Sequence, residues 1–232
     1  LGWLMAIFFI PFIGFLAFLI FGSSHLPQYR RARQHAMNDL IRETTGDTPQ
    51  LTDSDGLNEA TLVASQLNYK LGSLPLVGGN SFTLHNDNHE AMRIMAQEVN
   101  KAQRYVHFEF YITAYDEASK VLWDALFAAQ KRGVRVRVLI DHIGSRKYPS
   151  YKMLVKMLNE SGMQWRLMLP LKPWRLQWQR PDLRNHRKVL VIDGAVAFSG
   201  SQNAIHRSYD LKENVRKSLE WKDLTFSCTG PI

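Results

Sequence analysis

A histidine and a lysine two positions apart are the residues of this 232-residue chain whose types and spacing best suit chemistry. They are His186 and Lys188, and they begin an apolar run that predicts a strand over residues 186–193. On a period of two, both side chains share one face of that strand, whereas Asp193 has the opposite parity at its end. An imidazole beside a fixed ammonium suits attack on a phosphodiester, because the cation stabilises the negative charge that develops at phosphorus.

A turn and a returning strand place further polar residues after the first strand. The Asp-Gly pair that starts at Asp193 is a strong turn signal, and residues 195–199 are predicted as the hairpin partner. Gly200, Ser201 and Asn203 follow, where a hydroxyl, an amide and backbone N–H groups can hold phosphate oxygens. Because of its parity, Asp193 is expected to serve the turn or a structural ion pair.

The elements that must position these residues alternate between strands and helices from about residue 80 onward. The predicted strands cover residues 105–112, 134–141 and 163–169, and the predicted helices cover 88–103, 116–132 and 150–161. This alternation predicts an α/β sandwich with a mixed, partly parallel sheet. Glu109 and Asp141 lie on strands that are expected to end near the site, where each either binds an acceptor hydroxyl or pairs with an arginine.

The first 24 residues contain no ionisable side chain. As one helix they would rise about 36 Å, against a hydrocarbon core of roughly 30 Å, so residues 1–24 are predicted to span a membrane. The alternatives are a buried core helix or the apolar part of a signal peptide. Residues 25–72 are expected to be a basic juxtamembrane segment and linker. Its first arginines place this flank in the cytoplasm, either by enforcing orientation or by touching anionic headgroups.

Composition narrows the classes of partner. The formal net charge of +8 predicts attraction to phosphate-bearing partners, either nucleic acid or an anionic membrane. The 45% apolar content excludes a disordered chain, and a single cysteine, Cys228, excludes a disulfide framework or a cysteine-cluster metal site. Residues 169–180 interleave Trp174 and Trp178 with cations, which fits headgroup contact, stacking on single-stranded nucleic acid, or a loop packed over the sheet.

The run from His186 to Asn203 fits the pattern H-x-K-x4-D-x6-G-S-x-N without a gap, and so resembles the signature of the phospholipase D superfamily. The stretches HFEFYI at 107–112 and IDHIGSR at 140–146 look like bacterial cardiolipin synthases within that superfamily. The resemblance implies a cofactor-independent transfer through a phosphohistidine. One phosphatidylglycerol gives its phosphatidyl group to the glycerol hydroxyl of a second, and free glycerol leaves.

The resemblance also implies roles for individual residues. The catalytic motif would consist of His186, Lys188 and Asp193, with the histidine as nucleophile. The residues that would bind phosphate or substrate are Gly200, Ser201, Asn203, Glu109 and Asp141. Asp223 alternates with apolar neighbours, so it either faces the site and orients the imidazole or is a solvated strand residue.

The chain departs from the superfamily pattern in one respect, because it contains no second H-x-K. The superfamily's chemistry needs two histidines, and general acid catalysis contributes about 10²–10⁴ in rate, so half a site is expected to be nearly inert. Residues 73–232 are therefore expected to be a phospholipase D-like half-domain. Either a missing C-terminal half or a second copy of the chain would complete it.

Two other functions remain open from the sequence, namely a membrane-tethered homodimeric phosphodiesterase or nuclease and a catalytically incomplete scaffold. Because a predicted membrane span lies beside a phosphodiester-cleaving motif, we expect the anionic partner to be phosphatidylglycerol rather than nucleic acid. The expected location is the cell membrane, with the catalytic part on the cytoplasmic side.

Overall fold

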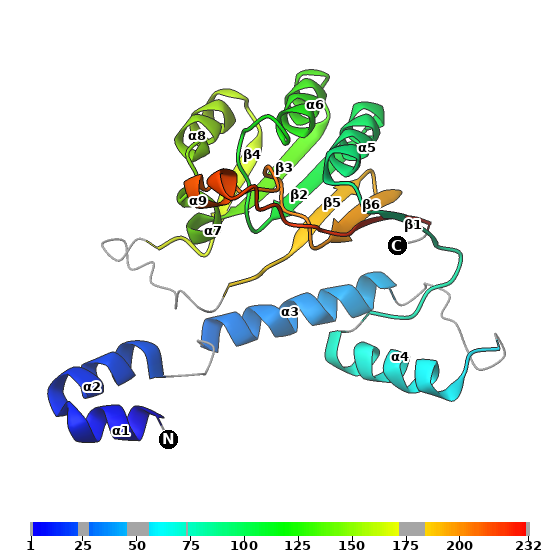
Figure 1. The fold of residues 1–232 in the computed structure, drawn as a ribbon. Helices are drawn as coiled ribbons and strands as arrows, with labels where there is room; N and C mark the ends of the chain where they lie inside the picture. The colour runs from blue at the N-terminus through cyan, green and yellow to red at the C-terminus, as the bar shows by residue number, and fades with distance from the viewer. Residues whose placement is uncertain (1, 23–27, 46–55, 73, 172–183, 231–232) are drawn as a thin grey trace. The chain divides into compact units, whose positions relative to one another are not determined.

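The computed structural model describes residues 2–22, 28–45, 56–72, 74–171 and 184–230 (Figure 1). The chain divides into two compact units, Leu1–Gly78 and Gly79–Ile232. Most of the tryptophan-bearing loop predicted at 169–180 lies outside the described residues.

The apolar N-terminus does not form the single helix that its hydropathy predicts. Helix α1 (Gly2–Phe9) ends before Ile10, whose φ of −136° and ψ of 69° are not helical. Helix α2 (Pro11–Ala17) then begins, followed by the short π-helical segment η1 (Phe18–Gly22). The break has a local cause, because proline donates no N–H and disfavours helical geometry in the residue before it.

This break corrects the prediction of one spanning helix over residues 1–24. Gly14 of α2 is buried, and a Cβ at this position would overlap the backbone of Ala6, so the missing side chain lets the two helices approach closely. Among the described residues, none of the helices is both long enough and apolar enough to cross a membrane.

Two further helices lie in the first unit, α3 (Gln28–Thr45) and α4 (Glu59–Gly72). The side chain of Asn58, directly before α4, accepts a hydrogen bond of 2.8 Å from the Thr61 amide. That contact satisfies one of the free N–H groups at the start of the helix. The segment predicted as juxtamembrane and linker is thus largely helical within the described residues.

The second unit is built on a mixed sheet. Its described strands are β1 (Ser81–His85), β2 (Tyr105–Phe110), β3 (Arg135–Asp141), β4 (Gln164–Met168), β5 (Lys188–Ile192), β6 (Val196–Gly200) and β7 (Thr225–Thr229). They lie in the order β1-β7-β6-β5-β2-β3-β4, with β2, β3 and β4 parallel and the remaining neighbours antiparallel. The predicted α/β class with a mixed, partly parallel sheet is confirmed.

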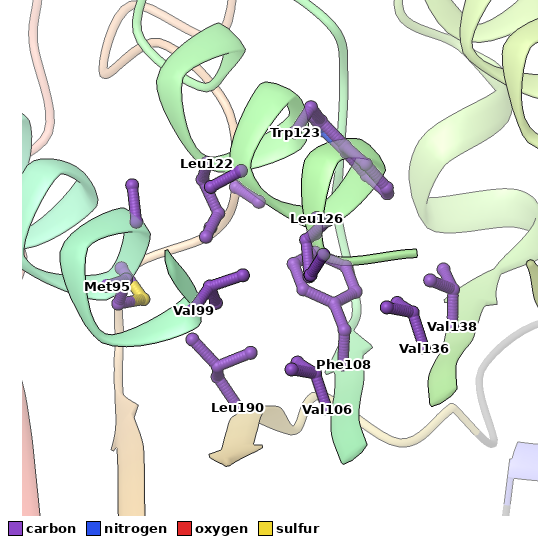
Figure 2. Packing of buried hydrophobic residues seen from close by; sticks show 14 of the residues in the cluster. Met95, Val99, Val106, Phe108, Leu122, Trp123, Leu126, Val136, Val138 and Leu190 are labelled. Carbon is purple, nitrogen blue, oxygen red and sulfur yellow. The ribbon is translucent and has the colours of Figure 1, made fainter. Parts of the chain in front are cut away.

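The helices of this unit are α5 (Asn88–Lys101), α6 (Lys120–Lys131), α7 (His142–Arg146), α8 (Tyr151–Glu160) and α9 (Lys212–Arg216). Helices α5 and α6 pack on one face of the sheet (Figure 1). Figure 2 shows Phe108 of β2 and Leu190 of β5 pointing toward Val99 of α5 and Leu126 of α6. Full burial of one such side chain contributes roughly 1.5–3 kcal/mol.

Strand β2 illustrates how the sequence pattern selects the two faces. Val106, Phe108 and Phe110 are buried, whereas His107 and Glu109 between them are only half-buried. Because successive side chains point to opposite faces, the apolar set enters the core and the polar set lies on the other face. The core thereby fixes the position of β2, and it also fixes the position of the residues at the carboxyl end of this strand.

Candidate functional site

His186 and Lys188 lie where β5 meets the end of β2. Lys188 is opposite Phe110 in the antiparallel pair, and the Tyr111 amide donates a 3.0 Å hydrogen bond to the Arg187 carbonyl. His186 precedes the strand rather than starting it, which corrects the predicted strand start at residue 186. The reason is geometric, because β2 ends at Phe110 and leaves no ladder partner for His186.

The two motif side chains meet at one aromatic ring. The exposed imidazole of His186 stacks on Tyr111, with ring centroids 3.9 Å apart and planes at 23°. The Lys188 ammonium donates a 2.7 Å hydrogen bond to the His186 carbonyl and lies 5.5 Å from the centroid of the Tyr111 ring. The structure therefore brings the predicted pair together around a tyrosine that the sequence did not single out.

Partial burial changes the acid–base balance of the lysine. Desolvation lowers the pKa of Lys188, and the nearby Asp223 carboxylate opposes that shift. Burial has this direction because it disfavours the charged form of a cation. An ammonium that is partly withdrawn from water interacts more strongly with an anion placed beside it, since less solvent screens the charge.

Ser201 and Asp223 form one hydrogen-bonded unit. The Ser201 hydroxyl donates to Asp223 at 2.8 Å and accepts from the Leu224 amide at 3.0 Å, while the Ser201 amide donates to the Leu224 carbonyl at 2.9 Å. The Asn88 side chain reaches the other carboxylate oxygen at 3.5 Å. Asp223 thus faces Ser201 and lies within electrostatic range of Lys188, and its orienting of the imidazole stays a prediction.

The backbone at Gly200 requires glycine for this unit to form. Its φ is +150°, and a Cβ at this position would overlap the Leu224 carbonyl oxygen and approach Thr225 Cα to 2.9 Å. The absence of a side chain lets the end of β6 lie directly against the segment before β7.

Asn203 connects two segments that follow strands. Its side-chain oxygen accepts a 3.0 Å hydrogen bond from the Ile112 amide, and its amide nitrogen donates to the Tyr209 hydroxyl at 2.8 Å. The side chain is buried and structurally engaged at both ends. A carboxamide has further donor and acceptor capacity, so phosphate binding by Asn203 stays a prediction.

Asp193 lies at the other end of β5, so the structure does not bring it to the two other motif residues. At about 3.3 Å per residue, the strand separates it from Lys188 by roughly 16 Å. Its carboxylate accepts hydrogen bonds from the amides of Gln103, Arg104 and Tyr105 at 2.7, 2.9 and 2.8 Å. Burial acts to raise the pKa of Asp193, but these three N–H groups outweigh it and the net pKa is lowered. The carboxylate thus fixes the turn to the start of β2.

Asp141 is paired with an arginine, one of the two alternatives that its position left open. Its carboxylate lies 3.1 Å from Arg184, with the two side chains 0% and 2% exposed. Its other oxygen accepts from the Gly144 amide at 2.7 Å, at the start of α7. Arg184 also donates to the Leu169 carbonyl at 2.6 Å, so the pair joins the segments after β3 and β4 to the one before β5.

Glu109 contacts an asparagine, and its binding of an acceptor hydroxyl stays a prediction. Its carboxylate accepts a 3.1 Å hydrogen bond from the Asn185 side chain. It lines a cavity of about 960 Å³ together with His107, Val189 and other residues of the sheet face opposite the helices. Lys188 instead lines a small cavity together with Phe110 and Phe198, which belong to the helix-covered side. Across the residues that the structure describes, no cluster of His, Cys, Asp or Glu is arranged to hold a metal ion.

The sequence reasoning missed Tyr111 as a site residue, although it lies within the stretch HFEFYI. Tyr111 immediately follows a strand whose alternation ends at Phe110, so periodicity does not show which way its ring points. Its nearness to His186 comes from the pairing of β2 with β5, which joins residues 75 positions apart. The signal available was its position at the carboxyl end of a core strand, where sites of α/β folds gather.

The fold and this arrangement define an α/β protein with an H-x-K motif at the ends of the central strands of a mixed sheet. A family model described as "Cardiolipin synthase, PLD-like domain" matches residues 95–224, more than half of the chain. The chain therefore belongs to this cardiolipin synthase, phospholipase D-like family.

Curated relatives of the chain are also named cardiolipin synthase. The chain is 33% identical over 213 residues to the major cardiolipin synthase ClsA of Bacillus subtilis, covering 87% of this chain and 42% of that protein. It is 27% identical over 236 residues to cardiolipin synthase A of Pseudomonas syringae, covering 100% of this chain and 48% of that protein. The chain spans less than half the length of these relatives. Among solved structures it is similar to Nuc of Salmonella typhimurium, a phospholipase D family member, with a TM-score of 0.47 and 19% identity over 66% of this chain and 85% of that one.

Proposed function

We propose that the second unit supplies half of a phosphatidyltransferase site, which makes cardiolipin and glycerol from two molecules of phosphatidylglycerol. The observation that carries this proposal is the exposed imidazole of His186 beside the partly buried ammonium of Lys188, inside the region that the family model matches. The names of the relatives support the substrate and the product.

The proposed phosphatidyl transfer proceeds in two steps. In the first, an imidazole nitrogen of His186 attacks phosphorus, an N–P bond forms, and the P–O bond to the leaving glycerol breaks while a general acid protonates that oxygen. In the second, the glycerol hydroxyl of another phosphatidylglycerol attacks phosphorus, its proton goes to the same group, and the N–P bond breaks. Lys188 would stabilise the charge on the non-bridging oxygens in both steps.

The second acid–base group must come from outside the described H-x-K motif. A C-terminal half or a second copy of the chain would supply it. The greater length of the relatives supports the first source, since the chain covers 42% and 48% of two of them.

A phospholipid substrate places the proposed reaction at the cell membrane. The first unit supports this location, because Phe8 of α1 and Phe12 of α2 are 80% and 85% exposed and can enter a lipid surface. The arginines at the start of α3 would favour the cytoplasmic side through the excess of positive charge found there.

The test incubates the chain, alone and as the complete gene product, with phosphatidylglycerol vesicles and measures cardiolipin and glycerol. We expect product only from the complete protein and none after His186→Ala. The matched control is His107→Ala, a histidine of β2 that lies against Tyr105 instead. Product that survives His186→Ala would remove the assigned nucleophile, and loss of activity on chelation would argue against a metal-free reaction. Salt-sensitive cleavage of DNA or RNA without lipid product would favour the nuclease alternative.

A further inference from the structure

Tyr111 contacts both side chains of the H-x-K pair. Its ring stacks face to face on the imidazole of His186, and the Lys188 ammonium lies 5.5 Å from the centroid of the same ring. A tyrosine face attracts a cation within about 6 Å of its centroid, because the ring quadrupole is negative there.

The surrounding structure holds this ring in place. Its backbone amide donates to the Arg187 carbonyl at 3.0 Å, and its carbonyl accepts from the Ser145 hydroxyl at 3.4 Å. A Cβ at Gly144 would overlap the Tyr111 carbonyl and lie 3.0 and 3.1 Å from two carbons of the ring. Gly144 therefore leaves the space that the ring needs, and α7 limits its movement on that side.

The phenol also stays neutral over the working pH range of most enzymes. Burial raises the pKa of Tyr111, and the Asp141 carboxylate raises it further, while Arg184 acts in the opposite direction. The stacked surface that faces the imidazole is therefore an uncharged ring.

We propose that Tyr111 is a positioning residue that fixes the plane of the His186 imidazole for attack on phosphorus. This inference rests on the proposed role of His186 as nucleophile. An exposed histidine can rotate about two side-chain bonds, whereas stacking at 3.9 Å restricts the direction in which its nitrogens point. Correct alignment of reacting atoms matters, because a misplacement of about 1 Å can cost on the order of 10²-fold in rate.

The same contact acts after the attack. Once the N–P bond forms, an imidazole that keeps its other N–H carries a positive charge. A ring face at stacking distance stabilises that cation relative to a solvated ring. Both effects need the aromatic ring of Tyr111, and neither needs its hydroxyl.

The activity arm compares three variants of the complete gene product on phosphatidylglycerol vesicles. Tyr111→Leu removes the ring and Tyr111→Phe keeps it. Tyr105→Leu is the matched control, since Tyr105 lies against His107 at the far end of the same strand, with ring centroids 4.8 Å apart and planes tilted by 31°. We expect Tyr111→Leu to lower kcat by roughly 10²-fold with little change in KM, because alignment and not binding is lost. Tyr111→Phe and Tyr105→Leu should retain most of kcat.

A spectroscopic arm needs no activity. NMR spectra are recorded on the whole chain in detergent with labelled histidine, and the His186 signals are assigned with the His186→Gln variant. The chemical shifts of the His186 ring protons should lie upfield of those of the exposed His35. Tyr111→Leu should abolish that difference and Tyr111→Phe should preserve it.

The two arms separate the possible failures. A complete wild-type protein that makes no cardiolipin would overturn the proposed function, while the spectrum would still report the stack. If the wild type is active, two results would overturn positioning by the ring. Either Tyr111→Leu keeps its kcat, or Tyr111→Phe loses as much kcat as Tyr111→Leu. If Tyr111→Leu does not fold, the wild-type spectrum alone decides. His186 ring protons that do not lie upfield of those of His35 would also overturn positioning by the Tyr111 ring.

Discussion

Replacing Arg184 by methionine is expected to destabilise the second unit by about 3–5 kcal/mol, the usual cost of leaving one partner of a buried ion pair alone. The two side chains are 2% and 0% exposed and their charged atoms lie 3.1 Å apart, so the Asp141 carboxylate would stay in the interior without a counter-charge. Methionine keeps much of the side-chain volume, so the change removes the charge and its hydrogen-bond donors without opening a large cavity.

The same substitution should also disturb the site. Arg184 bonds the Leu169 carbonyl, and Asp141 bonds the first turn of α7 at Gly144, so the pair joins three segments near His186. For a domain of about 150–250 residues, each kcal/mol lowers Tm by roughly 2–4 °C, which predicts a fall of about 6–20 °C. Circular dichroism melts of the purified chain measure this directly.

A double-mutant cycle tests the assigned cause. Asp141→Asn removes the charge and keeps a carbonyl oxygen for the Gly144 amide, so Arg184→Met with Asp141→Asn should be less destabilised than the two single changes summed. The control is Arg135→Met, an exposed arginine at the start of β3, the strand that ends at Asp141, and this variant should stay within about 0.5 kcal/mol of wild type. An Arg184→Met variant as stable as that control, or a cycle additive within about 0.5 kcal/mol, would refute the argument.

Three further predictions concern the motif itself. Asp193→Ala should cost about 1.5–3 kcal/mol at pH 7 through its lost charge-assisted hydrogen bonds. The pKa of Asp193 in the folded state lies below 3.8, so this contribution is present above pH 3.8 and is lost as the pH falls through the folded-state pKa. In urea melts, the difference in stability between wild type and Asp193→Ala should therefore be smaller at pH 3 than at pH 7. Gly200→Ala should destabilise the protein by about 1–3 kcal/mol. The control is Gly133→Ala, which should cost less, because the φ of Gly133 is also positive but a Cβ there meets no neighbour within 4 Å. Equal melting temperatures of the two variants would contradict the close approach at Gly200. Lys188→Met should lower kcat of the complete gene product on phosphatidylglycerol by about 10²–10³-fold, with the exposed Lys131→Met unchanged, and an unaffected kcat would exclude its electrostatic role.

The N-terminus shows where pattern reasoning fails. Hydropathy averaged over residues 1–24 predicts one long helix, but a single residue, Pro11, ends α1 and restarts the chain as α2. An average over 24 residues does not register a missing N–H group, and the local rule for proline outweighs it.

The sequence by itself determined the α/β class, the hairpin after Asp193 and the pairing of His186 with Lys188, because strand alternation, turn preference and spacing are local properties. Only the tertiary structure decided that Tyr111 lies on the imidazole, that Ser201 faces Asp223 and that Asp141 is neutralised by Arg184. Those contacts join residues 22 to 75 positions apart. Strand order and burial set such distances, and no local pattern in the chain encodes which strand ends will meet.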